Sequence, residues 1–149
     1  MTDHPDLTKL AKPFPASMVQ EKPGSFKAKY VAHARVVEKL LWVVGPYNYE
    51  ITQLIKSPDG IVEGCIGQLT VEIDGRVSVI SEVGDVEENA SAKNNGARAK
   101  EAASDAFKRC AMRLGVGLDL WVNGTPVLHG ALCSDELPDP VEEDSGDVA

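Results

Sequence analysis

Two stretches of the chain space their apolar residues three or four apart, as on one side of a helix. The first covers residues 25–44, and Gly45-Pro46 directly after it is a typical helix end. Its apolar stripe consists of Tyr30, Ala34, Val37, Leu40, Leu41 and Val44. The second covers residues 97–115, with Ala99, Ala103, Ala106, Phe107, Cys110 and Leu114 on one side. The spacing therefore predicts two amphipathic helices, over residues 25–44 and 97–115.

Between these stretches, apolar and polar residues alternate, which predicts three β-strands. The first strand is expected over residues 49–56, and the turn sequence of residues 57–60 leads to a second strand over 61–73. Asp74-Gly75 separates it from a third strand over residues 76–83 and predicts a two-residue type I′ hairpin. An apolar sheet face needs a cover. We therefore expect an α+β fold, a three-stranded antiparallel β-meander covered by two helices in the order α-β-β-β-α.

The two ends of the chain differ from this central region. Residues 1–24 contain four prolines, which permit at most a short helix around Asp6 to Lys12 and predict an N-terminal arm. Residues 25–133 form the predicted core domain, because 149 residues are enough for about one domain. Residues 134–149 are rich in acids, Pro, Ser and Gly, which predicts a disordered acidic tail.

Charge is unevenly distributed along the sequence. The net charge is −8 at pH 7, but seven acids and no base follow Ser134, so residues 1–134 carry 16 acids and 15 bases. Within that part, residues 22–56 and 93–113 each carry a net charge of +4, whereas residues 59–88 carry −7. Phosphate binding depends on Lys and Arg. The two basic segments, each containing a predicted helix, are therefore the candidates for contact with nucleic acid.

Three arginines share one flank of the helix predicted over residues 97–115. At about 100° per residue, Arg98, Arg109 and Arg113 lie within about 60° of one another. This flank is either free to meet phosphates or a solvated surface on which Asp105 pairs with Arg109. Lys108 lies about 100° from Arg109, so one flank cannot present both equally.

A second basic flank is predicted on the helix of residues 25–44. Arg35, Lys39 and Trp42 lie within about 60° of one another, with Trp42 either buried or exposed for stacking on bases. If both helices cover one sheet, their cations can line a single groove. That groove would be lined by Arg35, Lys39, Arg98, Lys108, Arg109 and Arg113. The prediction depends on Arg35 and Arg109 reaching the same open channel.

Motifs for other chemistry are missing from the sequence. Cys65 and Cys110 occupy apolar positions and Cys133 has no CxxC partner, so small buried residues are favoured over a disulfide framework or reactive thiols. The three histidines have no ligand spacing, so we expect no metal. We find no P-loop, dinucleotide turn or catalytic triad and therefore expect no cofactor and no enzymatic activity. No apolar run approaches about 20 residues and no secretory signal is found, so a cytoplasmic protein without membrane contact is expected.

Read in order, several short motifs resemble the Rad52-type single-strand annealing proteins, over about Tyr30 to Gly117. They are Tyr30-Val31, Arg35-Val36-Val37, Gly45-Pro46-Tyr47-Asn48, the meander, and Lys100-Glu101-Ala102 with Asp105, Lys108-Arg109 and Gly115. The resemblance implies a ring-forming homo-oligomer with single-stranded DNA in a basic groove, which anneals complementary strands without hydrolysing nucleotide. Small phage-encoded members of this group are known, and the short chain suits one.

The same resemblance implies which residues contact DNA. Arg35 matches a DNA-contacting arginine, Lys108 and Arg109 match a basic pair, and Tyr47 matches a tyrosine near the groove. Together with the charged flanks, this gives the predicted DNA-binding set of Arg35, Lys39, Tyr47, Arg98, Lys108, Arg109 and Arg113. A position that is basic in the family is Met112 here.

Two further points stay open in the sequence. The alternative to DNA binding is an oligomeric structural or interaction protein whose charges are only solvated surface. The acidic tail either keeps the protein soluble or occupies the basic groove until DNA displaces it. The sequence also does not say whether a nuclease or a single-strand-binding protein is a partner.

Overall fold

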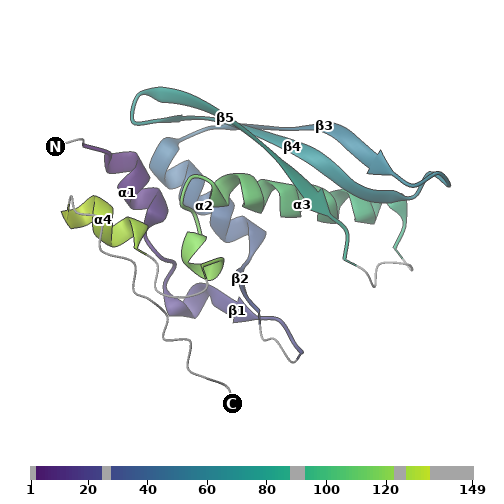
Figure 1. Ribbon diagram of the computed structural model, residues 1–149, viewed down its shortest axis with the longest axis horizontal. Helices are drawn as coiled ribbons and strands as arrows, with labels where there is room; N and C mark the ends of the chain where they lie inside the picture. Colours follow the sequence, from purple (N-terminus) through teal and green to yellow (C-terminus); the bar gives the residue numbers. More distant parts are fainter. Residues whose placement is uncertain (1–2, 25–27, 88–92, 123–126, 135–149) are drawn as a thin grey trace, which may run out of the picture.

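The three predicted strands form an antiparallel sheet in the order β3-β4-β5. The computed structural model describes residues 3–24, 28–87, 93–122 and 127–134 (Figure 1). The strands are β3 (Asn48–Lys56), β4 (Val62–Ile73) and β5 (Arg76–Asp85). Asp74 and Gly75 both have positive φ, 49° and 78°, as a type I′ turn requires. The predicted meander and its hairpin are thus confirmed.

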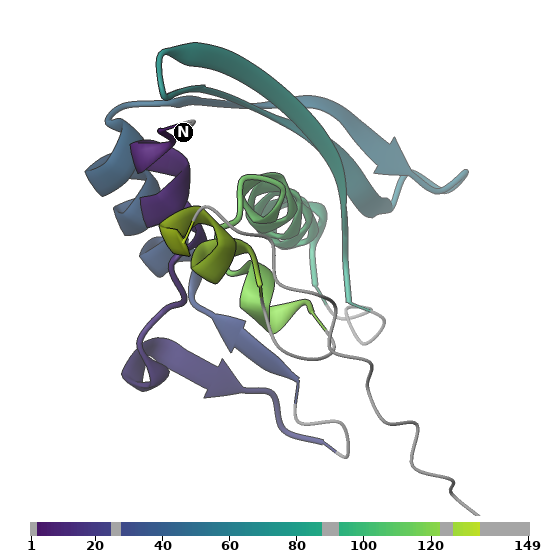
Figure 2. The same cartoon turned by 60° about the vertical axis from the view of Figure 1, so that its left-hand side comes forward.

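Helix α3 (Asn95–Met112) packs along the concave face of this sheet. Figure 2 shows the helix nearly end-on beneath the curved strands. The Asn94 side chain caps the helix by accepting a hydrogen bond from the Ala97 N–H at 2.8 Å. Phe107 and Cys110 bury their side chains against Leu69 of β4 in one core. The predicted second helix is therefore confirmed, with slightly different ends.

Helix α2 (His33–Val44) begins eight residues later than predicted. Tyr30 and Val31 belong to strand β2 (Lys29–Val31), which pairs antiparallel with β1 (Val19–Glu21). The prediction of one helix over residues 25–44 is wrong because the arm supplies a strand partner that local periodicity does not reveal. Residues 25–27 lie outside the described residues.

The position of α2 also differs from the predicted cover. Helix α3 makes nearly all of the helix contacts with the sheet, whereas α2 packs against α1 (Pro5–Ala11) and α3. Val36 and Leu40 are the buried residues of α2, whereas Leu41 of the predicted stripe is 49% exposed and Trp42 is 87% exposed. The predicted pair of covering helices is thus one covering helix with a second helix beside it.

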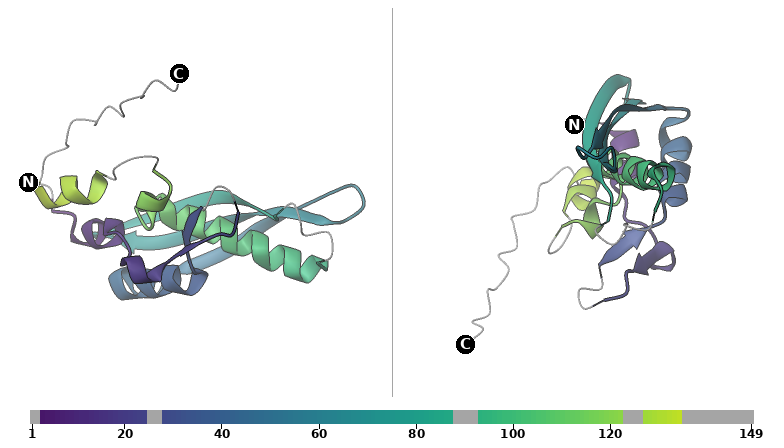
Figure 3. Two further views of the ribbon diagram at one scale, coloured as in Figure 1. Left: turned by 90° about the horizontal axis from the view of Figure 1, so that it is seen from below. Right: turned by 90° about the vertical axis from the view of Figure 1, so that its right-hand side faces the viewer.

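Short elements complete the end of the molecule that carries α2. The 3-10 turn η1 (Ala16–Met18) precedes β1, and η3 (Leu118–Leu120) and α4 (Leu128–Ser134) follow α3. Viewed from below in Figure 3, α1, α2 and α4 gather at one end while α3 and the meander extend to the other. Leu10 of α1 is fully buried in the core. The predicted tail, apart from Ser134 at the end of α4, lies outside the described residues.

Two aspartates fasten the arm to the β4–β5 turn. The Asp74 carboxylate accepts hydrogen bonds from the backbone N–H of Asp6 at 2.8 Å and of Leu7 at 3.3 Å. In return, the Asp6 carboxylate accepts one from the Asp74 N–H at 2.8 Å. The carboxylate thereby satisfies N–H groups that the first turn of α1 leaves unpaired.

Asp74→Ala is expected to lower the free energy of unfolding by about 2 kcal/mol, because it removes this cap and places alanine at a positive φ. Urea denaturation followed by circular dichroism measures the change. Asp74→Gly removes the same carboxylate but tolerates the φ, so about half of the loss is expected. An alanine variant as stable as the natural protein would contradict this role for the carboxylate.

Candidate nucleic-acid interface

The predicted DNA-binding residues separate into two surfaces, of which the first lies beside helix α2. It is a cleft of about 460 Å³ between α2, the end of α1 and the segment that follows α1. We call it the α2 cleft. Its charged lining residues are Lys9, Lys12, Arg35, Lys39 and Glu38, and its aromatic ones are Phe14 and Trp42. The cleft therefore combines a net charge of +3 with two aromatic rings.

Lys39 is the most restricted cation of the α2 cleft. Its ammonium group donates a hydrogen bond to the backbone carbonyl of Lys12 and lies 4.4 Å from the centre of the Phe14 ring. Burial lowers the pKa of Lys39 to about 8, with Lys12 acting in the same direction and Asp119 opposing it. Close to neutral pH, this side chain is thus near its own titration point.

Arg35 and Trp42 form the open part of the same cleft. The Arg35 guanidinium pairs with Glu38 at 3.0 Å on the exposed surface of α2, where such a pair contributes little free energy. Trp42 is 87% exposed, which answers the open question of whether it is buried. An exposed indole beside cations suits stacking on unpaired bases.

The second surface runs along α3 opposite the β1–β2 hairpin. Two adjoining cavities of about 330 and 260 Å³ share Lys22, Asp105 and Lys108 in their linings, and we call them together the α3 groove. Its cations are Lys22, Lys29, Lys108 and Arg109, and its carboxylates are Asp85, Glu87, Glu101 and Asp105. Among the described lining residues, four cations are balanced by four carboxylates, so this lining carries no net charge.

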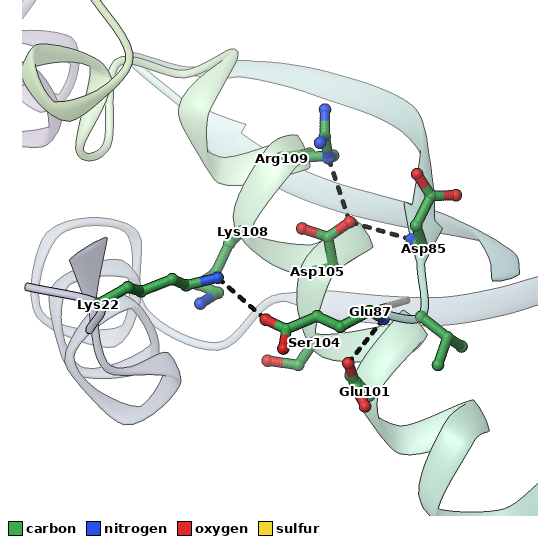
Figure 4. Close-up of a pocket in the computed structure, with 9 residues that line it drawn as sticks. Lys22, Asp85, Glu87, Glu101, Ser104, Asp105, Lys108 and Arg109 are labelled. Atoms are coloured by element: carbon green, nitrogen blue, oxygen red, sulfur yellow. Dashed lines mark hydrogen bonds and ion pairs between the residues drawn. The ribbon is translucent and has the colours of Figure 1, made fainter. Parts of the chain in front are cut away.

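Ion pairs cross the α3 groove, as Figure 4 shows. Lys22 reaches from the arm to Glu87 at 3.0 Å. The Asp105 carboxylate accepts from Arg109 at 3.2 Å and from the backbone N–H of Asp85 at 3.0 Å. The predicted Asp105–Arg109 pair is thus confirmed, and its carboxylate also joins α3 to the sheet.

Lys108 and Arg109 both line the α3 groove although they point in different directions from the helix. The Lys108 ammonium lies 6.0 Å from the centre of the Tyr30 ring, and burial lowers the pKa of Lys108. The Arg109 guanidinium lies 5.1 Å from the Trp121 ring centre. Each cation thus has an aromatic neighbour of its own.

The remaining predicted residues line neither surface. Arg98 donates a hydrogen bond from Nε to the carbonyl of Val62 at 2.6 Å, and Arg113 pairs with Glu82 of β5. Tyr47 stacks on Phe107 in the core, with ring centres 5.8 Å apart, and burial raises the pKa of Tyr47. Arg98 and Arg113 join α3 to the strands, because their partners Val62 and Glu82 lie on β4 and β5.

The prediction that one groove unites these cations is therefore wrong. Arg35 lines the α2 cleft and Arg109 lines the α3 groove. The reason is that α2 packs against α1 and α3, and only α3 covers the face of the sheet. Both arginines pair with carboxylates, yet each still borders an open cavity.

Sequence reasoning missed the contribution of the arm to both surfaces. Lys9, Lys12 and Phe14 complete the α2 cleft, and Lys22 crosses the α3 groove. The signal was present in the arm as three lysines and a phenylalanine among its prolines. In the part of the chain that the structure describes, no group of three His, Cys, Asp or Glu side chains could hold a metal, and no helix could cross a membrane.

Comparison with known proteins gives two matches. Residues 7–122 match the family described as Rad52/22 family double-strand break repair protein. The chain is also 30% identical over 148 residues to the single-stranded DNA-binding protein DdrA of Deinococcus radiodurans. That alignment covers 88% of this chain and 64% of DdrA, so the chain spans less than two thirds of the length of this relative.

Proposed function

Because the chain belongs to the Rad52/22 family of double-strand break repair proteins, we propose that it binds single-stranded DNA and anneals complementary strands without hydrolysing nucleotide. The observation that carries the proposal is the α2 cleft, with its net charge of +3 and its exposed Trp42. Phosphates are attracted to the cations, and the indole offers a surface on which a base can stack. The similarity to DdrA, a single-stranded DNA-binding protein, supports the same ligand.

The α3 groove is the proposed second contact along the strand. Its cations are balanced by carboxylates, so its affinity for phosphate is expected to be lower than that of the α2 cleft. The Lys108–Arg109 pair would contact the backbone there only after giving up partners within the groove. Arg98, Arg113 and Tyr47 are proposed to support the fold around this path.

A ring-shaped homo-oligomer is the proposed assembly. Val77, Val79 and Val83 are exposed on β5, and Ile51 and Leu54 are exposed on the edge strand β3. Exposed apolar residues along a sheet and its open edge favour contact with another copy of the chain. In a ring, the α2 clefts would repeat around the axis and hold one strand, and the bases that do not stack on Trp42 would stay accessible for pairing.

Salt dependence of binding to a fluorescent oligothymidylate tests this proposal. The logarithm of the affinity is expected to fall linearly with the logarithm of salt concentration, with a slope of about −0.7 for each phosphate contacted. Two complementary oligonucleotides should anneal faster in the presence of the protein, without added nucleotide. A salt-dependence slope near zero, together with an oligomeric state that does not change when DNA is added, would instead identify a structural or interaction protein.

Raising the pH from 7 to 9.5 is expected to weaken oligothymidylate binding about tenfold more in the natural protein than in Lys39→Arg. With a pKa of about 8, the Lys39 ammonium is mostly charged at pH 7 and mostly neutral at pH 9.5. Only the charged form attracts phosphate, and arginine stays charged throughout this range. Anisotropy titrations of both proteins at fixed salt measure the difference. Parallel pH profiles would show that Lys39 does not face the DNA.

A further inference from the structure

We propose that the acidic segment of residues 135–144, which directly follows α4, binds in the α2 cleft of its own chain and is displaced by single-stranded DNA. The displacement rests on the proposed function, whereas the docking does not. The segment would act as an intramolecular competitor, which lowers the apparent affinity of the cleft for DNA.

The sequence of this segment complements the lining of the cleft. Residues 135–144 contain six carboxylates and no base, interleaved with Leu137, Pro138, Pro140 and Val141. Proline-containing segments bind grooves lined by aromatic rings, because their preferred extended conformation costs little entropy to fix. The α2 cleft provides Trp42 and Phe14 for the prolines and four cations for the carboxylates. The segment thus combines acidic with apolar residues, and the α2 cleft combines cations with aromatic rings.

The segment also begins close enough to reach the cleft. His129 Nδ1 of α4 lies 3.1 Å from the Thr8 carbonyl oxygen of α1, and α1 in turn packs against α2. Two successive helix–helix spacings amount to about 20 Å. Ten extended residues span up to about 33 Å. Because the cleft is itself lined by Lys9 and Lys12 at the end of α1, the first few residues after Ser134 are enough to pass α1, and the later ones, up to Asp144, can enter the cleft.

Charge favours the α2 cleft over the α3 groove as the docking site. The α2 cleft has Glu38 as its single carboxylate among the described lining residues. The α3 groove already contains four carboxylates, which would repel a further acidic segment. An acidic segment is thus attracted by the net positive charge of the α2 cleft, whereas the balanced charges of the α3 groove offer no such attraction.

Acrylamide quenching of Trp42 fluorescence tests the docking directly in the full chain. A Trp121→Phe background leaves Trp42 as the reporting indole. One variant replaces the six acids of residues 135–144 by their amides, and a second keeps all six charges but replaces Leu137, Pro138, Pro140 and Val141 by serine. Both variants are expected to increase the quenching constant of Trp42 about twofold or more. Unchanged quenching in both would overturn the proposal.

Oligothymidylate affinity of the same two segment variants, made without Trp121→Phe, tests the competition. The amide variant is expected to bind about tenfold more tightly, and the serine variant, although equally acidic, about threefold more tightly. If affinity rises in the amide variant alone, with Trp42 quenching unaltered, the segment repels DNA from a distance and does not dock. If no variant binds DNA but Trp42 quenching still increases, the docking is supported and the proposed function fails.

Discussion

Gly84→Ala is expected to lower the free energy of unfolding by about 3 kcal/mol or more, a large fraction of the roughly 5–15 kcal/mol that is typical of a domain. Gly84 is a buried residue of β5 that lies directly against α3. A Cβ atom there would lie 2.0 Å from the carbonyl oxygen of Ala102 and 2.6 Å from the backbone nitrogen of Ala106. Both atoms belong to the helix backbone, so no side-chain rotation can relieve the overlap. The substitution must separate helix and sheet.

Gly96→Ala is the matched control for this substitution. Gly96 lies in the exposed first turn of α3, and an added Cβ would meet the Asn94 side chain at 3.4 Å. Alanine is favoured over glycine in a helix, so the control is expected to be neutral or stabilising by up to about 1 kcal/mol. Urea denaturation followed by circular dichroism compares the two proteins. Equal stabilities would show that β5 can move away from α3 at little cost.

The double variant Arg35→Glu with Lys39→Glu is expected to lose about 100-fold in affinity for oligothymidylate at physiological salt. It changes the net charge of the α2 cleft from +3 to −1, so attraction of phosphates becomes repulsion. A loss of this size corresponds to about 2.7 kcal/mol of binding free energy. Fluorescence anisotropy at one fixed salt concentration measures it, and circular dichroism establishes that the variant is folded.

Lys56→Glu with Arg76→Glu controls for net charge alone. Both residues are exposed at strand ends and line neither the α2 cleft nor the α3 groove, yet the double substitution changes the charge of the chain equally. A loss of less than about fivefold is expected. The milder pair Arg35→Gln with Lys39→Gln should lose about tenfold without adding acids near Asp119. If Lys108→Glu with Arg109→Glu is more damaging than the first variant, the α3 groove is the principal site.

The strands were predictable because their signals are local. Alternation defines each strand, and Asp74-Gly75 favours the positive φ values that close the hairpin. The start of α2 was not predictable in the same way. Tyr30 and Val31 fit the apolar spacing of a helix and equally the pairing of a strand. Their pairing with β1 decided between the two, and that strand lies in a part of the chain without periodicity.

The arrangement of the cations was only partly predictable for a related reason. Helical spacing shows which arginines share a flank of α3, but not what packs against that flank. Glu82 and the Val62 carbonyl, both on strands, receive Arg113 and Arg98. The exposure of Trp42 likewise depends on how α2 is rotated against α1, which no local pattern encodes. Only the basic character of both helices could be read from the sequence.

The fastening of α1 determines when the cleft can exist during protein synthesis. Two hydrogen-bond partners of α1 are made much later than the helix itself. Asp6 bonds to Asp74, and Thr8 bonds to His129, which follows it by 121 residues. Pairing across such distances comes late in folding, because long loops must close first. A growing chain that has not yet reached the β4–β5 turn therefore exposes α2 without the wall that α1 provides. The α2 cleft therefore gains its complete wall only after the β4–β5 turn and α4 have both been made and hold α1 in place.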